Sequence, residues 1–166
     1  MGKMRLPQIV SDINVFVDGI GFAGVADKEN FKFPEIEEET ESIKNGGFER
    51  SYGKGVFKKL EFEFTLKEIH PIIYTALGTS KSTGVGSMFI CKGNASQDGK
   101  KKQFIATITS SNFSISHKGT DTTIKGEARL YMFEFDGVPL VIMDTDNMIA
   151  NIGGIDYLAE VRKNIM

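Results

Sequence analysis

The segment Gly19-Ile20-Gly21-Phe22-Ala23-Gly24 matches the G-x-G-x-x-G pattern of dinucleotide-binding proteins. In those proteins the third glycine opens a helix whose N-terminus faces the pyrophosphate of the cofactor. The residues that follow here, 25–34, have no helical periodicity and end in a proline. We therefore interpret these glycines as turn residues between two strands, and we expect no bound cofactor.

The two histidines and the single cysteine are the next candidates for chemistry. His70 and His117 are far apart in the sequence, and neither lies in a cluster with the spacing of metal ligands. Cys91 lies in a run of strand type, and two histidines with one thiol cannot supply the four ligands of a structural zinc site. No order of serine, histidine and aspartate indicates a catalytic triad. We therefore expect a protein that is not an enzyme, without catalytic or metal-binding residues.

The composition narrows the class of protein further. The chain has 166 residues and a net charge of −2, which indicates one domain over residues 1–166 and argues against a protein that grips a nucleic-acid backbone. One cysteine cannot form an internal disulfide. The sequence has neither the apolar run of a secretory signal nor the roughly 20 apolar residues that span a bilayer. We therefore expect a soluble intracellular protein with no stable membrane association.

Most of the chain has the alternating pattern of β-strands. The clearest alternation, between Leu60 and Leu66, puts leucine and phenylalanine on one face and charged residues on the other. The alternation changes phase around Ser110-Ser111, as at a bulge or a corner where a strand leaves one sheet for another. Strands are expected at residues 13–17, 22–26, 31–43, 56–66, 87–92, 103–117, 122–136 and 138–144.

Two short helices complete the expected fold. One is expected to begin near His70 with Pro71 at its first position, and to stop at Gly78 before a polar loop at residues 79–86. The other begins at about Asp156. The sequence thus predicts a mainly β fold, a small antiparallel β-barrel or sandwich with a flanking α-helix and a short C-terminal helix.

Two stretches have a composition that suggests a function. Residues 35–41 contain five glutamates in seven positions, and like charges on one strand cost stability through mutual repulsion. Residues 44–55 form a glycine-rich segment that predicts a long inter-strand loop, and loops of this length in a compact domain are often functional.

As a whole, the chain resembles the major tail tube protein of contractile-tailed bacteriophages. Tailocin-type particles use similar tube proteins. The resemblance spans essentially the entire chain in order. It rests on Met4-Arg5-Leu6-Pro7, on residues 13–24, on the acidic strand with Lys44-Asn45-Gly46-Gly47, on residues 60–66, on Asp146-Asn147-Met148-Ile149 and on residues 154–159.

The resemblance implies a structural subunit of the inner tube of a contractile tail. Six copies would form a ring in which one sheet of each subunit joins its neighbours around a lumen. The rings would stack into a hollow tube that conducts DNA and the tape-measure protein into the host cell. The implied location is the virion tail or a tailocin particle, assembled in the bacterial host cytoplasm.

The resemblance also implies partners. Besides other copies of the chain, these are the sheath protein, the baseplate or tube initiator, the tape-measure protein and the tail terminator. DNA would pass through the lumen without specific binding. The glycine-rich segment would order against the adjacent ring, and its candidate contact residues are Lys44, Asn45, Gly46, Gly47, Phe48, Arg50, Tyr52 and Lys54.

A physical argument predicts the charge of the lumen wall. Because DNA carries about one charge per 1.7 Å of axis, a cationic wall would hold it and stall its passage. A wall of carboxylates repels DNA mildly, over a distance that salt limits to about 8 Å. The candidate lumen-facing residues are Glu35, Glu37, Glu39, Glu41, Glu61 and Glu63.

Two alternatives remain open from the sequence. The same architecture could form the tube of a headless tailocin or of a secretion-type injector. A small ligand-binding β-barrel is a weaker alternative, because it calls for an apolar interior cavity and the chain has 13 phenylalanines to fill its interior.

Overall fold

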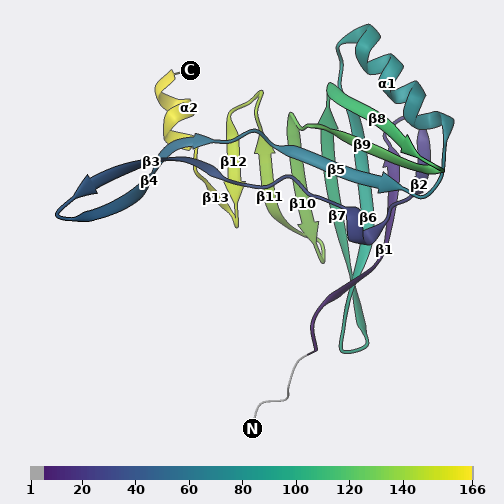
Figure 1. The fold of residues 1–166 in the computed structure, drawn as a ribbon, viewed down its shortest axis with the longest axis horizontal. Coiled ribbons are helices and arrows are strands. Elements are labelled where there is room, and N and C mark those ends of the chain that lie inside the picture. Colours follow the sequence, from purple (N-terminus) through teal and green to yellow (C-terminus); the bar gives the residue numbers. More distant parts are fainter. Residues whose placement is uncertain (1–5, 166) are drawn as a thin grey trace.

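The structure, a computed structural model, describes residues 6–165 and is built mainly of strands (Figure 1). The mainly β prediction is therefore confirmed. Met4 and Arg5, which contribute to the resemblance described above, lie outside the described residues. Two α-helices, α1 (Pro71–Thr83) and α2 (Ala159–Ile165), and a 3-10 turn η1 (Lys28–Asn30) interrupt the strands. The strands are β1 (Ile9–Val17), β2 (Gly21–Val25), β3 (Glu38–Asn45), β4 (Phe48–Phe57), β5 (Glu61–Leu66), β6 (Ser87–Gln97), β7 (Lys100–Ser110), β8 (Asn112–Lys118), β9 (Asp121–Glu127), β10 (Leu130–Phe135), β11 (Val138–Asp144), β12 (Ile149–Ile152) and β13 (Ile155–Asp156).

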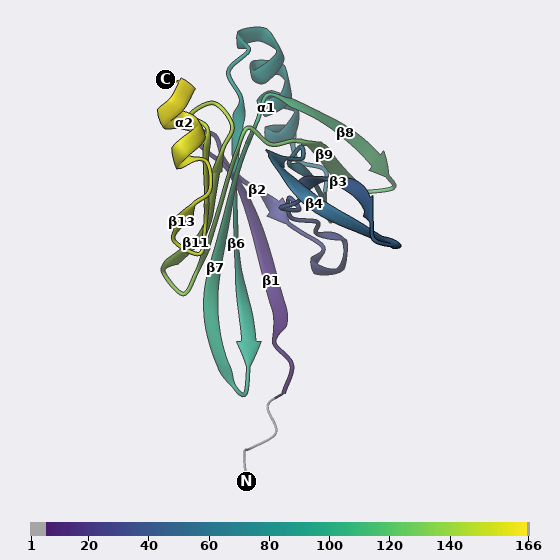
Figure 2. The same ribbon diagram turned by 90° about the vertical axis from the view of Figure 1, so that its left-hand side faces the viewer.

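The strands form two layers, which Figure 2 shows from the side. The large layer is an eight-stranded antiparallel sheet with the order β13-β12-β11-β10-β7-β6-β1-β2. The small layer holds the three-stranded sheet β5-β9-β8 and, continuing from β5, the hairpin β3-β4. The sheets do not close into a barrel, so the barrel form of the prediction is wrong and the sandwich form describes the layers better.

Phenylalanine rings fill the space between the two layers. Phe62 and Phe64 from the small layer meet Phe89 of the large sheet, with ring centroids 6.1 and 5.6 Å from it. Phe113 of β8 packs edge-on against the same ring at 5.2 Å. All four side chains are buried, and burying such a ring stabilises the fold by about 1.5–3 kcal/mol. Aromatic contacts between strands far apart in the sequence thus join the layers.

The chain passes from the large layer to the small one at Ser110. β7 ends there in the large sheet, and β8 begins two residues later in the small sheet, so the expected corner is confirmed. The Ser110 hydroxyl donates to the Glu127 carbonyl at 2.7 Å, and the Asn112 N–H donates to the Ser110 hydroxyl at 3.3 Å. The buried serine therefore supplies polar partners at the point where the backbone leaves the ladder.

The helix α1 begins as expected but ends later. The Nδ1 atom of His70 accepts from the Ile72 N–H at 3.2 Å, and Pro71 follows at the first helical position. The predicted stop at Gly78 is wrong, since the helix continues to Thr83 and ends at Gly84, where φ is 70°. Ser80, which the sequence placed in a polar loop, is buried in the last turns of the helix. Packing of this inner face overrides the helix penalty of Gly78.

We expect the substitution Phe89→Ala to lower the free energy of unfolding by about 3–5 kcal/mol, because it leaves a cavity where three other rings converge. Phe48→Ala is the matched control. The Phe48 side chain is 74% exposed, so we expect a change below about 0.5 kcal/mol. Urea unfolding of both variants measures the difference. Equal losses of stability would contradict the placement of the core.

Candidate functional site

The histidines and the cysteine occupy structural positions. His70 caps α1, and the His117 ring stacks on Tyr74 of the same helix with centroids 5.5 Å apart. Cys91 is fully buried in the large sheet, and this burial raises the pKa of its thiol well above the ordinary value. Within residues 6–165, no group of three or more histidine, cysteine, aspartate or glutamate side chains is arranged to hold a metal ion.

The segment that the sequence predicted as a long loop, residues 44–55, is instead part of a β-hairpin. β3 and β4 pair in antiparallel register from Glu38 opposite Phe57 to Asn45 opposite Phe48. Gly46 and Gly47 form the turn with φ of 61° and 81°, as a two-residue turn with two left-handed positions requires. The sequence Asn-Gly-Gly between two strands was the signal that could have revealed this hairpin. Figure 1 shows it projecting from the body of the molecule.

The two faces of this hairpin differ in chemistry. Phe48, Tyr52 and Ile43 share one face, according to the register, and are 74%, 45% and 46% exposed. We call these three residues the apolar stripe of the hairpin. Glu41 and Arg50 lie on this face as well, whereas the opposite face, where Ser42 pairs with Ser51 and Lys44 with Glu49, carries no large apolar side chain within residues 40–53. A two-stranded hairpin is marginally stable by itself in water, so an exposed apolar stripe on it calls for a partner.

Two carboxylates of β3 hold the hairpin in register. The Tyr52 hydroxyl donates to the Glu41 carboxylate at 2.9 Å, and this hydrogen bond raises the pKa of Tyr52. Nearer the body, the Gly55 N–H donates to the Glu38 carboxylate at 2.6 Å. Part of the acidic run therefore supports the hairpin itself, which the sequence did not indicate.

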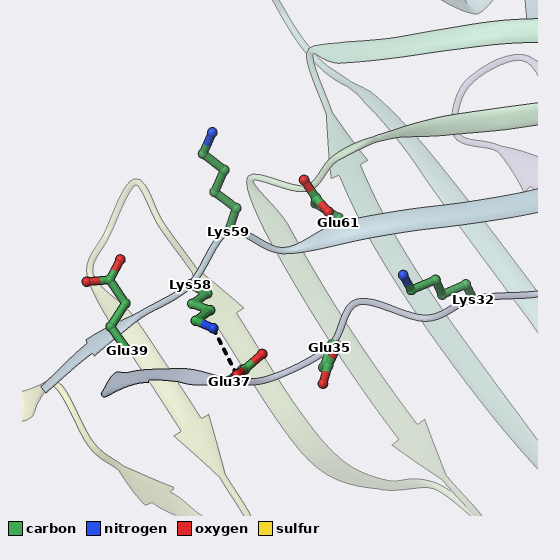
Figure 3. A pocket seen from close by; sticks show the side chains of 7 residues that line it. All are labelled: Lys32, Glu35, Glu37, Glu39, Lys58, Lys59 and Glu61. Carbon is green, nitrogen blue, oxygen red and sulfur yellow. Dashed lines mark hydrogen bonds and ion pairs between the residues drawn. The ribbon is translucent and has the colours of Figure 1, made fainter. Parts of the chain in front are cut away.

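Four of the six predicted lumen residues lie around one open pocket where the hairpin joins the body (Figure 3). Three lysines that the sequence analysis did not select share this pocket. Lys58 donates to the Glu37 carboxylate at 2.9 Å, and this hydrogen bond raises the pKa of the lysine. The lining residues are Lys32, Glu35, Glu37, Glu39, Lys58, Lys59 and Glu61. The other two candidates lie apart from this pocket, Glu41 in the hairpin and Glu63 further along β5.

Glu61 and Glu63 belong to an entirely polar surface. The inner face of the sheet β5-β9-β8 carries the buried Phe62, Phe64 and Ile124, and its outer face carries no apolar side chain. The register aligns three rows on this outer face, which we call the polar face. The rows are Glu61, Glu127 and Asn112; Glu63, Lys125 and Ser114; and Thr65, Thr123 and Ser116.

A comparison with known protein families identifies the family of the chain that carries these surfaces. The family model described as phage tail tube protein FII matches residues 7–165. The chain belongs to this family. A search of curated protein sequences gives no match.

Family membership gives the tail tube protein a structural role in the virion tail. The match covers both layers, the hairpin and both helices, so no part of the described fold lies outside the family region. Among the described helices, none has the length and apolarity needed to cross a membrane.

We expect the substitution Glu41→Gln in the tail tube protein to lower the pKa of Tyr52 toward the ordinary value of about 10, because it removes the charged acceptor of the hydroxyl. Glu49→Gln changes the same charge in the same hairpin without touching Tyr52 and is the control. A pH titration of the Tyr52 ring resonances by NMR measures the shift. Equal pKa values in both variants would contradict the hairpin register.

Proposed function

We propose that this tail tube protein forms hexameric rings that stack into the hollow inner tube of a contractile tail, and that the hairpin β3-β4 makes the contact between rings. The apolar stripe of the hairpin carries this proposal. The hairpin projects from the body (Figure 1), and the three side chains are exposed and lie outside the core of their own subunit. Covering them against the next ring would bury apolar area worth about 25 cal/mol per Å². This contact is head-to-tail, so it propagates without closing.

Within a ring, we propose that the small layer pairs with its neighbours edge to edge. One edge is β8, a seven-residue strand without proline, which is the outermost strand of this sheet among the described residues. The other edge is formed by residues 31–37, which pair with β5 at the bridge Lys32–Glu63. Proteins usually protect such edges with charge, proline or a covering loop. Residues 31–37 carry Pro34, Glu35 and Glu37, so this edge favours a partner strand that brings no opposing carboxylate, and β8 is such a strand.

This arrangement would turn the polar face toward the lumen. The backbone pairing leaves one face of the small layer on the phenylalanine core, and the other must face solvent. The rows hold hydroxyls, an amide and three carboxylates against the one ammonium group of Lys125, so the polar face carries a net negative charge and would interact weakly with passing DNA. The pocket beside this face holds four carboxylates against three ammonium groups, which leaves the wall mildly acidic.

The remaining partners follow from the role in a tail. We propose that the sheath protein surrounds the tube, that a baseplate or initiator protein starts it, and that a terminator ends it. The tape-measure protein and DNA would occupy the lumen in turn, and assembly would take place in the host cytoplasm. The open sheets favour the tube over the ligand-carrier alternative, because a carrier of that kind would use a closed barrel.

The first test is electron microscopy of the purified protein at high concentration, in which we expect rings and hollow tubes. We expect Phe48→Asp to leave the subunit folded but to abolish stacking, because it places a charge in the apolar stripe. Ser51→Asp adds the same charge to the opposite face of the hairpin and should still form tubes. Tubes of normal length from Phe48→Asp would contradict the role of the hairpin. A wild-type chain that stays monomeric at all concentrations would contradict the tube itself.

The lumen is tested with the double substitution Glu61→Lys, Glu63→Lys. We expect tubes of this variant to retain short DNA duplexes at low salt and to release them as salt rises, because each cationic contact releases counterions. Wild-type tubes should not retain DNA. The double substitution Asp12→Lys, Glu160→Lys makes the same change in charge at exposed positions of the large sheet and of α2, and it serves as the control. Retention by the control alone would place these glutamates outside the lumen.

A further inference from the structure

The lower part of the phenylalanine core is open to solvent. The small layer covers the large sheet only near one end of the strands β1, β6 and β7, and the other end of these strands extends beyond it, as Figure 2 shows. Beyond this crossing lies a groove of about 310 Å³, which we call the phenylalanine groove. Leu140 at its rim is 40% exposed. The lining residues are Gln8, Val10, Phe33, Ala95, Phe104, Phe133, Phe135 and Leu140.

The outer face of α1 is unusual for a helix in contact with water. Such helices normally carry charged residues on the solvent side, yet the thirteen residues of α1 include one charged residue, Lys81. Tyr74 and Thr75 are exposed on this face. A face without carboxylates, with hydroxyls and one aromatic ring, is suited to contact with another protein surface.

Gly78 gives an independent reason to expect a close neighbour. It lies in the middle of α1 and is exposed, where glycine disfavours the helix relative to alanine. A Cβ at this position would meet no atom of the subunit within 4 Å, and the backbone does not have a positive φ. Nothing within the subunit therefore requires glycine here. Close approach of another backbone or side chain from outside would require it.

The groove and the helix lie at opposite ends of the same strands. At one end of β1 and β6, Val10 and Ala95 line the groove. At the other end, the Ser87 hydroxyl donates to the Ala76 carbonyl of α1 at 3.0 Å. The eight residues from Val10 to Val17 span about 23 Å. A second copy displaced along these strands would therefore bring its α1 to the groove of the first.

We propose that the outer face of α1, formed by Tyr74, Thr75 and Gly78, docks in the phenylalanine groove of the next copy in the ring. This inference rests on the proposed tube and names the surfaces that join subunits side by side. The contact is heterologous, so it closes into a ring when repeated around an axis. In this contact one copy supplies both α1 and β8. Its α1 would enter the groove of the neighbour, and its β8 would pair with residues 31–37 of that same neighbour.

The charges at this edge support a second copy as the occupant. Residues 31–37 include Glu35 and Glu37, both exposed. β8 has no carboxylate and ends in His117-Lys118. The acidic edge of one copy would thus meet a strand free of like charge, which avoids the cost of opposing carboxylates. The apolar groove and the outer face of α1 meet in the same contact without burying an unpaired acid.

The decisive variant is Gly78→Lys in the full-length chain. We expect it to raise the Tm of the free subunit by about 2–4 °C, because lysine favours the helix and its Cβ has open space. We also expect it to abolish rings and tubes in electron micrographs. Gln103→Lys, an exposed position on the opposite face of β7, should assemble normally. A more stable Gly78→Lys subunit that still forms rings would overturn the proposed docking while leaving the tube intact.

A cross-linking experiment identifies the occupant directly. The variants Thr75→Cys and Leu140→Cys are mixed and oxidised under conditions in which wild-type protein forms tubes. We expect a disulfide-linked dimer from the mixture and none from either variant alone; Cys91 is buried and should not react. Cross-linking of Leu140→Cys to Val161→Cys in α2, or no cross-link in intact tubes, would overturn the docking of α1. Failure of the wild-type chain to form rings or tubes would overturn the proposed function, and the docking with it.

Discussion

Two apolar surfaces of this subunit, the phenylalanine groove and the apolar stripe of the hairpin, are not covered by the subunit itself. The large sheet uses eight strands to bury one face against the phenylalanine core, and the small layer covers only the upper part of that face. The hairpin β3-β4 leaves the body with an apolar stripe that its own subunit does not cover. Here the uncovered groups lie at opposite ends of the molecule, where other copies can reach them.

The same phenylalanine core explains why the sheets cross without closing. Rings such as Phe89 and Phe113 meet edge to face, and they hold the small layer at an angle over one end of the large sheet. Closing the barrel would require the outer strands β2 and β13 to pair with each other, yet they are the two ends of the eight-stranded order. The Ser110 corner then passes the chain into a separate sheet. Strong packing at one end of the strands therefore leaves the other end open, and the phenylalanine groove is the result.

Local patterns predicted the parts of the fold in which sequence neighbours determine the structure. The alternation at Phe62 and Phe64, the phase change at Ser110 and the cap at His70 all depend on nearby residues, and all are confirmed. The end of α1 was wrong, because a buried Ser80 beyond Gly78 extends the helix through tertiary packing. The hairpin was missed, because two glycines interrupt the alternation in β4 and because the pairing depends on cross-strand contacts such as Tyr52 to Glu41. The lysines beside the predicted lumen glutamates could not be predicted, since the chain brings Lys32 and Lys58 together only after it folds back.

Two kinds of head-to-tail contact impose an order on the proposed assembly. A two-stranded hairpin is marginally stable alone, so fixing its apolar stripe in one position costs conformational entropy. The free energy gained from a single contact offsets only part of this cost. In the proposed assembly, a complete ring would present six such contacts at once, and each new subunit would gain both a lateral neighbour and a surface below it. Growth on an existing ring would therefore be favoured over the formation of a first ring from free subunits. This difference would make an external initiator the starting point of a tube, and it would leave the subunit free at low concentration until an initiator is present.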